Sequence, residues 1–373
     1  MLSISERPFS YNDMIGQKGI LFEMKNRSKT INFAPVMLFE GETGTGKTTT
    51  ALITAALINC KNPIDKGEYK DPCGQCPSCK SILEETFNRD TYFFDASQMA
   101  KEDVLKVENL ARVVPLHDRN KIFIIDEAQE LSKSGKGATL HLLEKKRKNV
   151  YFILNTMNVN ALDKAVSSRG QCYKFKNIPD TEIAEYLFNL IEKNKLEVSD
   201  EFIEKGLLLI ARNSTGSVRE ALQNLERCMK GKHFSEEEIL EEFGFVDERQ
   251  LFVILHMLIK KDPEFFKHFK KLEKKAFYFY SYKVILSLLK YKITETVDAP
   301  WKKSYYDTLI QENGKIAELL EFYNQTVYTN YYFNDDKFEG LIIKYYLKEE
   351  KFYAHSFLEG GAVKKKKREA VGS

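Results

Sequence analysis

The chain contains the continuous run Val36-Met37-Leu38-Phe39-Glu40-Gly41-Glu42-Thr43-Gly44-Thr45-Gly46-Lys47-Thr48-Thr49. Within it, Gly41 to Thr48 fits G-x-x-x-x-G-K-[ST], the phosphate-binding loop of nucleotide hydrolases. The apolar residues before the loop predict a buried parallel strand, and Thr49 to Asn59 predicts a helix after it. A glycine- and threonine-rich surface loop is the alternative, but a strand before and a helix after are the context that the motif requires.

This loop has the composition of a site for ATP and Mg²⁺. Its glycines let backbone N–H groups turn inward around phosphate oxygens, and the N-terminus of the following helix adds partial positive charge. We expect Lys47 to reach the β- and γ-phosphates and Thr48 to hold Mg²⁺. The loop residues expected to bind the nucleotide are Gly41, Thr43, Gly44, Thr45, Gly46, Lys47, Thr48 and Thr49.

A second apolar run, Ile122 to Ile125, ends in the carboxylates Asp126 and Glu127. At the carboxyl end of a buried parallel strand, side chains face the ligand crevice. We expect Asp126 to lie on the Mg²⁺ side and Glu127 to orient or deprotonate the attacking water. An Asp-Glu pair alone is common, and a solvated turn is the alternative; after an intact phosphate loop the pair predicts a hydrolytic site.

Three further features extend this reading. Val150 to Asn158 predicts another buried strand whose polar end could sense the γ-phosphate. Arg169 precedes a β-like alternation, where an exposed arginine is usually only a solvated charge. Ser217-Val218-Arg219-Glu220 is a capping box, which places Arg219 in a first helical turn against the helix dipole. A nearby phosphate would resolve that conflict, and an exposed, tolerated arginine is the alternative.

Four of the six cysteines fit the pattern Cys60-x12-Cys73-x2-Cys76-x2-Cys79. Thiolates favour tetrahedral Zn²⁺, and two-residue gaps let neighbouring sulfurs converge on one ion. The spacing therefore predicts a structural zinc site, with a redox role as the competing interpretation. Cys172 and Cys228 are isolated and predict buried thiols.

Length and composition describe an ordinary soluble protein of two or three domains. The 373 residues are 43% hydrophobic and 30% charged, with a formal net charge of +3. Any nucleic-acid contact must therefore come from a local patch and not from a global basic field. Met1 to Tyr11 lacks the apolar core of a signal peptide, and no stretch is long and apolar enough to predict a membrane span.

The pattern along the chain predicts four parts. Residues 1–177 form an α/β nucleotide-binding domain into which the zinc module, 60–79, is inserted, and residues 178–245 form a small helical domain. Residues 246–360 form an all-α domain, and 361–373 a disordered basic tail that contacts nucleic acid or an acidic partner, or is solvated and inert. The helices predicted in the all-α domain include Gln250 to Lys260, Phe277 to Leu289, Trp301 to Gln311 and Lys315 to Tyr328.

Together, these motifs resemble the bacterial DNA polymerase III clamp-loader ATPase of gamma/tau type, within the AAA+ proteins. The resemblance covers roughly residues 5 to 245 by motif. Its most specific element is the four-cysteine module between the phosphate-loop helix and the second strand. The other motifs in matching order are Arg7-Pro8, Ile15-Gly16-Gln17, Asp126-Glu127, Ser168-Arg169 and Gly216 to Leu222.

The resemblance implies a P-loop parallel sheet with flanking helices, a helical lid and an all-α collar. Arg7 and Thr156 would contact the nucleotide, Arg169 would be an arginine finger for a neighbouring subunit, and Arg219 would be the sensor-2 arginine of the lid. The partners would be the other subunits of a pentameric ring, a sliding clamp and primer-template DNA, in the cytoplasm of a bacterial or phage-infected cell. The alternatives are a non-catalytic ring subunit and another AAA+ DNA-remodelling ATPase.

Primer-template DNA would be contacted at its phosphates by Lys133 and Lys136, which start the helix after Asp126-Glu127. A solvated turn is the alternative there. The chain also departs from the family pattern in several places. Gly170 follows Arg169 where the family has cysteine, Met157 takes the usual sensor-1 threonine position beside Thr156, and the long tau extension is missing. We expect these departures in a divergent copy from a virus or mobile element.

Overall fold

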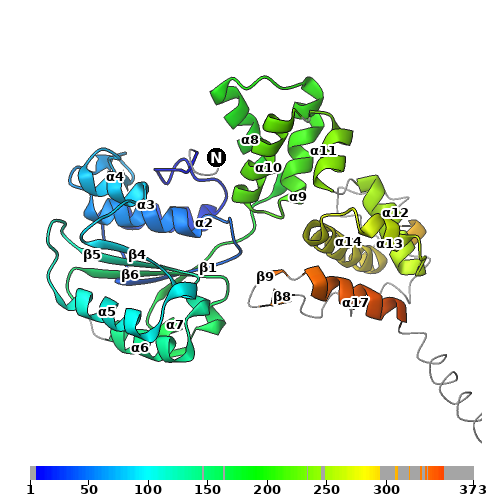
Figure 1. The fold of residues 1–373 in the computed structure, drawn as a ribbon. Coiled ribbons are helices and arrows are strands. Elements are labelled where there is room, and N and C mark those ends of the chain that lie inside the picture. Colours follow the sequence, from blue (N-terminus) through cyan, green and yellow to red (C-terminus); the bar gives the residue numbers. More distant parts are fainter. Residues whose placement is uncertain are drawn as a thin grey trace, which may run out of the picture. The chain divides into compact units, whose positions relative to one another are not determined.

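The predicted strand before the phosphate loop, β1 (Val36–Glu40), lies inside a five-stranded parallel sheet (Figure 1). The strand order is β4–β5–β6–β1–β7, and every neighbouring pair is parallel. The carboxyl ends of β1, β5 and β6 therefore meet at one edge, as expected for a ligand site. The other strands are β4 (Thr91–Asp95), β5 (Lys121–Asp126), β6 (Val150–Thr156) and β7 (Gln171–Lys174).

The computed structural model describes residues 6–144, 147–162, 164–232, 234–244, 248–294, 307–309, 319, 328–329, 332–333 and 335–347. The chain divides into two compact units, Met1–Ile239 and Leu240–Ser373. The division falls inside the helix α11 (Glu236–Phe243), and the limit predicted for the lid, residue 245, lies just beyond it. Among the described residues, every helix is too short or too polar to span a bilayer.

Helices cover both faces of the sheet (Figure 1). Met37 and Phe39 of β1 pack into the core on one face, whereas Val36 and Leu38 pack into the core on the other. Burial on both faces explains why β1 reads as a continuous apolar run. One face carries α2 (Lys18–Ser28), α3 (Lys47–Asn59) and α4 (Pro77–Leu83); the other carries α5 (Lys101–Arg112), α6 (Lys133–Glu144) and α7 (Lys164–Ser167).

Short elements lie at the ends of the sheet. The cysteine-rich insertion contains the antiparallel hairpin of β2 (Ile64–Asp65) and β3 (Lys70–Asp71). Three 3₁₀ turns follow strands β4, β5 and β6 in turn, where the chain leaves the sheet. They are η1 (Ala96–Gln98), η2 (Ala128–Glu130) and η3 (Val159–Ala161).

After β7 the chain of the first unit is helical, as the sequence predicts from Pro179 onward. Ser217 caps α10, because its Oγ accepts a hydrogen bond from the N–H of Glu220 at 3.2 Å. Between α8 and α9 the chain forms a π-helical turn, η4 (Phe202–Gly206). The helices are α8 (Asp180–Asn194), α9 (Leu207–Asn213), α10 (Val218–Gly231) and the start of α11.

The described part of the second unit is built mainly from helices with an aromatic core. Phe265, Phe269, Phe277 and Phe338 are buried and stack or meet edge to face. Its elements are α12 (Glu248–Lys260), α13 (Phe265–Phe269), α14 (Lys274–Thr294), α17 (Asp335–Leu347) and the short strands β8 (Tyr328–Thr329) and β9 (Tyr332–Phe333). The helices predicted at Trp301–Gln311 and Lys315–Tyr328 lie mostly outside the described residues, as do 348–360 and the basic tail.

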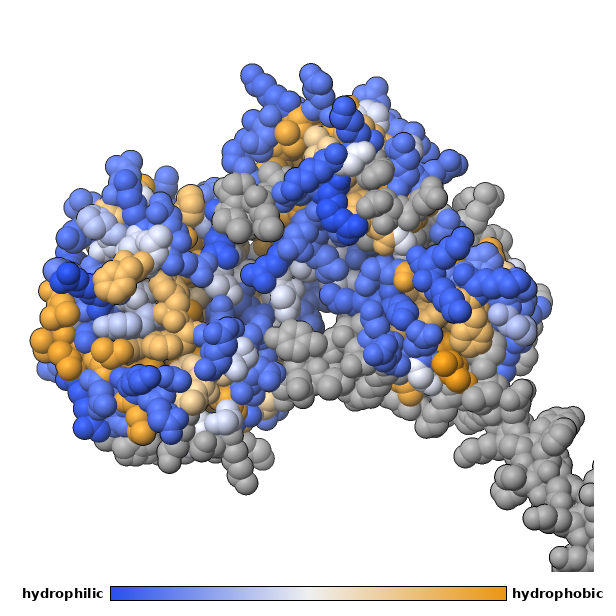
Figure 2. Space-filling view, viewed as in Figure 1, coloured by the Kyte–Doolittle hydropathy of each residue, from blue (hydrophilic) through white to orange (hydrophobic). Residues whose placement is uncertain are grey.

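A single carboxylate fixes the segment between α5 and β5. Val113, Val114 and Leu116 of this segment are exposed, and apolar residues gather at the edge of the sheet-bearing unit (Figure 2). Asp90, at the start of β4, is fully buried and accepts hydrogen bonds from three consecutive backbone N–H groups, those of Leu116 (2.8 Å), His117 (2.6 Å) and Asp118 (2.9 Å).

The pKa of Asp90 reflects this arrangement. Burial raises the pKa of the carboxyl, but the three N–H donors and Lys121 outweigh burial and hold the pKa below its ordinary value. Asp90 therefore stabilises the folded state in its charged form.

Asp90→Ala is expected to lower the free energy of unfolding by about 2 kcal/mol, because three backbone N–H groups lose a buried, charged acceptor. Since the folded pKa lies below the unfolded one, the contribution is complete above the unfolded pKa of about 4 and is lost as pH falls through the folded pKa. Urea unfolding of both proteins from about pH 7 to about pH 3 measures this, with Glu102→Ala on the exposed face of α5 as control. A stability difference that stays constant down to the acidic end would contradict the assignment.

Candidate active site

The phosphate loop is shaped by glycines and by the lid helix that lies on it. Gly44 and Gly46 have φ angles of 81° and 102°, in the left-handed region that favours glycine. A Cβ on Gly44 would lie 2.0 Å from the Oγ of Ser217, so no other residue fits there. The N–H of Val218 donates to the carbonyl of Gly44 at 3.1 Å. The N-terminus of α10 therefore sits directly on the loop.

Lys47 begins α3 and is nearly buried beneath the loop. Its Nζ donates to the carbonyl oxygens of Gly41 at 2.7 Å and Glu42 at 2.9 Å. Burial lowers the pKa of Lys47, while the nearby carboxylates of Glu127 and Asp126 act in the opposite direction. The loop thus holds a poorly solvated cation close to the place where phosphates would lie.

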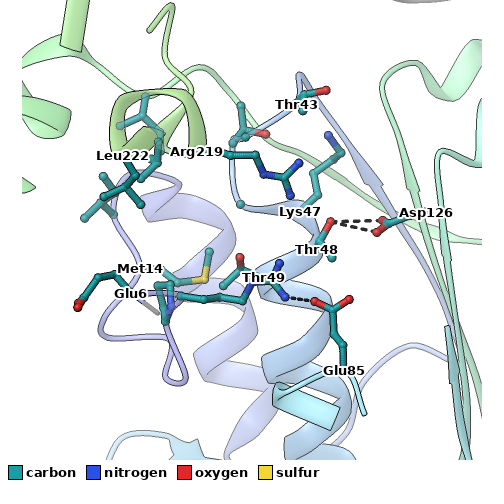
Figure 3. A pocket seen from close by; sticks show the side chains of 18 of the residues that line it. Glu6, Met14, Thr43, Lys47, Thr48, Thr49, Glu85, Asp126, Arg219 and Leu222 are labelled. Atoms are coloured by element: carbon teal, nitrogen blue, oxygen red, sulfur yellow. Dashed lines mark hydrogen bonds and ion pairs between the residues drawn. The ribbon is translucent and has the colours of Figure 1, made fainter. Parts of the chain in front are cut away.

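Asp126, at the end of β5, meets Thr48 of α3 (Figure 3). The Oγ1 of Thr48 donates to both carboxylate oxygens of Asp126 at 3.3 Å. The side-chain amide of Asn155 donates to the same carboxylate from the neighbouring strand β6. Burial raises the pKa of Asp126, and the hydrogen bond from Asn155 opposes this shift. A hydroxyl beside a carboxylate is a donor set that fits Mg²⁺.

Glu127 is held by Gln129, a residue that the sequence reading missed. Glu127 has a φ angle of 51°, and its carboxylate accepts a hydrogen bond from the side-chain amide of Gln129. The Oε1 of Gln129 in turn accepts from the Oγ1 of Thr156 at 2.9 Å and from the N–H of Met157 at 3.1 Å. Gln129 thus ties the expected base to the end of β6.

Thr156 lies differently from the position expected of a nucleotide contact. It is fully buried and lies outside the residues that line the pocket, with its hydroxyl bonded to Gln129 and to the carbonyl of Asn158. Met157 instead approaches the phosphate loop, with its sulfur 3.9 Å from the Oγ1 of Thr43. The sequence offers little that would identify Asn155 and Gln129 as part of the site. Asn155 is a polar residue near the end of a predicted strand, and Gln129 lies two residues after Glu127.

A cavity of about 440 Å³ adjoins the loop and lies between the sheet-bearing domain and the lid helices. Arg219 extends into it from the first turn of α10 toward the loop that carries Lys47 (Figure 3). Arg7 also lines the cavity and is paired with Glu85. Apolar side chains from the N-terminal residues and the lid also line the cavity, namely Pro8, Met14, Ile15, Ile178 and Leu222. A mixture of charged and apolar lining suits a nucleotide, whose phosphates are charged and whose base is largely apolar.

The remaining predicted residues lie away from this cavity. Arg169 follows α7, is exposed and does not line the cavity of its own chain. A Cβ on Gly170 would lie 2.6 Å from Cγ of Leu38, so a side chain there would disturb the core beneath β1. Lys133 and Lys136 lie in the first turn of α6, where Ser132 Oγ accepts from the N–H of Gly135 at 3.1 Å.

The four cysteines of the predicted module come together. The Sγ atoms of Cys60, Cys73, Cys76 and Cys79 all lie within 4.8 Å of one another, and those of Cys73 and Cys79 are 3.8 Å apart. Zn–S bonds of about 2.3 Å in a tetrahedron place sulfurs about 3.8 Å apart, so the cluster fits Zn²⁺. Burial raises the pKa of the Cys60 and Cys79 thiols. Burial acts in the same direction at Cys73, but the N–H groups of Cys76 and Gln75 outweigh it and lower the pKa of that thiol to about 6. A bound cation would favour the thiolate form of the cysteines that hold it.

Comparisons with known proteins agree with the motifs. The family model described as "DNA polymerase III, delta subunit" matches residues 16–179, the part that holds the sheet. DNA polymerase III subunit gamma of Buchnera aphidicola from Baizongia pistaciae is 32% identical over 69% of this chain and 68% of that protein. The same subunit from Acyrthosiphon pisum Buchnera is 30% identical over 69% of this chain and 70% of that protein.

The chain belongs to the gamma/tau family of DNA polymerase III clamp-loader subunits. This confirms the resemblance drawn from the motifs. Among solved structures, the RuvB Holliday junction branch migration motor of Thermotoga maritima matches with a TM-score of 0.46 and 16% identity, over 68% of this chain and 80% of that chain.

A zinc ion held by the cysteine cluster would give the gamma/tau chain a metal-dependent stability that can be measured. Cys76→Ser is expected to lower bound zinc from one ion per chain to almost none and to lower the melting temperature, because metal binding is coupled to folding. Zinc is measured by releasing it into a chromogenic chelator. Cys172→Ser, which changes a thiol outside the cluster, should keep both the metal and the melting temperature. Full zinc content in Cys76→Ser would rule out the four-cysteine site.

Proposed function

We propose that this chain is an ATP-hydrolysing motor subunit of a clamp loader, which opens a sliding clamp and loads it onto primer-template DNA. The observation that carries the proposal is the convergence of Lys47, the Thr48–Asp126 pair and Glu127 on one cavity. Membership of the gamma/tau family supplies the clamp and the DNA as the expected partners.

Each residue has a role that follows from its chemistry. Lys47 and Arg219 would offer positive charge to the phosphates of ATP from two different helices, α3 and α10. Thr48 and Asp126 would hold Mg²⁺, which supplies charge neutralisation at the phosphates. Glu127 would orient the attacking water, and Gln129 keeps its carboxylate in place. Because Arg219 stands on α10, whose N-terminus lies on the loop, binding of ATP would draw the lid and the sheet together.

The roles of Lys47 and Glu127 can be tested separately, because one variant should affect both binding and turnover of ATP and the other turnover alone. Lys47→Ala is expected to lower ATP turnover at least about 100-fold and to weaken binding, since it removes the buried cation. Glu127→Gln should keep binding and lower turnover about 100-fold or more, since the amide cannot take a proton. A fluorescent ATP analogue and a phosphate-release assay measure the two properties, with exposed Lys29→Ala as control. Equal turnover in Lys47→Ala and wild type would favour a non-catalytic ring subunit instead.

Arg169 is proposed to act on the ATP of a neighbouring subunit. Arg169 is exposed, and it is not among the residues that line the cavity of its own chain. A guanidinium that arrives from another subunit stabilises transition-state charge only in the assembled ring. The isolated chain should therefore turn over ATP slowly.

Arg169→Ala is expected to leave nucleotide affinity and turnover of the isolated chain unchanged. In a complex reconstituted with its partner subunits, clamp and primer-template DNA, the variant should lose roughly 1,000-fold of the stimulated turnover. Exposed Lys148→Ala serves as a charge-matched control. A wild-type complex that neither clamp nor DNA stimulates would overturn the clamp-loading role, and an equal loss in the isolated chain would overturn the action in trans.

The proposed DNA contact is to phosphates and not to base edges, because a loader acts on any sequence. Lys133 and Lys136 stand in the first turn of α6, where the helix N-terminus also favours an anion. Such binding ignores base sequence and weakens steeply as salt rises. The cysteine cluster is proposed to bind a structural zinc, since its four sulfurs leave no ligand position open.

A further inference from the structure

The N-terminal segment, defined here as residues 6–15, forms part of the wall of the nucleotide cavity. Six of its members line the cavity together with the phosphate loop, among them Arg7, Met14 and Ile15. A Cβ on Gly46 of the loop would lie 2.9 Å from Met14 Cε, so the segment touches the loop itself. The position of this segment therefore contributes to the shape of the site.

One flank of the segment is bound by the cysteine module through Asp71. Asp71 is 2% exposed and precedes Cys73 by two residues. Its carboxylate accepts a hydrogen bond from the Oγ of Ser10 at 2.8 Å and from the N–H of Tyr11 at 3.3 Å. Hydrogen bonds to a charged acceptor are stronger than neutral ones, so Asp71 is an effective anchor.

A second contact comes from the other end of the module. Cys76 is the N-cap of the short helix α4, and Cys79 lies within that helix. The turn that follows α4 carries Glu85, whose carboxylate pairs with the guanidinium of Arg7 inside the cavity wall (Figure 3). The cluster and the buried residues Ile82 and Leu83 together fix the direction of α4 and hence the place of Glu85.

The opposite flank of the segment is bound by the lid. The Nζ of Lys193 lies 2.9 Å from the carboxylate of Glu6, and the hydroxyl of Tyr186 donates to the Glu6 carbonyl at 3.4 Å. Both partners belong to α8. The segment thus bridges the cysteine module and the lid across one side of the cavity.

A closed cysteine cluster would support the anchor, because the hairpin that carries Asp71 is short. Its hairpin has two residues per strand, and the residues of β2 are exposed. A two-stranded hairpin of this size is not stable by itself. A metal ion shared by the four thiols would join the hairpin to α4, so a closed cluster would hold Asp71 and Glu85 more firmly than the bond from Lys70 to Ser28 of α2 and the core contacts of α4 alone. Tyr11 is fully buried and bonded to Thr54 of α3, so the segment keeps one anchor of its own.

We propose that Asp71 and Glu85 are positioning residues through which the zinc module orders the N-terminal segment and thereby strengthens nucleotide binding. This inference rests on the proposed ATPase function of the same cavity. The module would then contribute to nucleotide binding as well as to the stability of the fold. If the segment is unordered, nucleotide binding has to order it, and the entropy lost in doing so lowers the affinity.

Asp71→Ala in the full chain tests the inference. We expect unchanged zinc content and roughly tenfold weaker binding of a fluorescent ATP analogue, the size expected when a charge-assisted anchor is lost. Hydrogen exchange in the peptide that covers residues 6–15 should become faster in the same variant. Asp65→Ala, an acidic residue of the same hairpin that bonds only within it, is the matched control and should match wild type.

Glu85→Ala, with exposed Glu84→Ala as its control, provides an independent test of the second contact. If Asp71→Ala also loses zinc, Glu85→Ala decides: weaker binding at full zinc content supports the inference, and wild-type binding overturns it. Wild-type affinity in Asp71→Ala at full zinc content also overturns it. Failure of the proposed ATPase function looks different, because then the wild-type chain itself would not bind or hydrolyse ATP.

Discussion

Burial of helix α3 is the constraint on which the rest of the site depends. Its first residue is Lys47 of the phosphate loop, and its C-cap is Cys60 of the cysteine cluster. Almost every residue between them is buried against the sheet, α4 or the N-terminal segment. A helix of this length spans about 20 Å and bends little, so the core fixes both ends at once. The phosphate loop and the cysteine module are therefore joined by one rigid helix, although their chemistry differs.

Charge around the loop is balanced only when an anion is present. The N-termini of α3 and α10 both point to the loop, and each carries a partial positive charge. Arg219 stands in the first turn of α10, where its charge is unfavourable to the helix, and it also lowers the pKa of Lys47. Asp126 and Glu127 offset part of this positive potential, and phosphates with Mg²⁺ would complete the balance. The helix dipoles, the two cations and the carboxylates thus favour the same ligand.

The sequence predicts those parts of the site that follow from a local motif or from the end of a buried strand. The phosphate loop and the cysteine cluster follow from local spacing, and the place of Asp126 follows from its position at the end of β5. The partners from β6 do not, because they depend on register: Asn155 pairs with Phe39 of β1 and Thr156 with Glu40, so the two residues face opposite sides of the sheet. A single-residue choice along β6 therefore decides which side chain reaches Asp126. The contact of Gln129 with Glu127 depends in addition on the left-handed backbone at Glu127, which residue identity does not indicate.

Contacts between distant residues also explain why the sequence predicts only a structural zinc site for the cysteine module. Its ligand spacing is local and specifies the metal, whereas Asp71 meets Ser10 across sixty-one positions of the chain. Energetic coupling between two sites is reciprocal. If the closed cluster strengthens nucleotide binding through the N-terminal segment, bound nucleotide must strengthen the hold on zinc by the same factor. A module inserted at the far end of α3 from the phosphates would then be most stable in the nucleotide-bound state, and the lid, tied to the same segment through Glu6, would share that stabilisation.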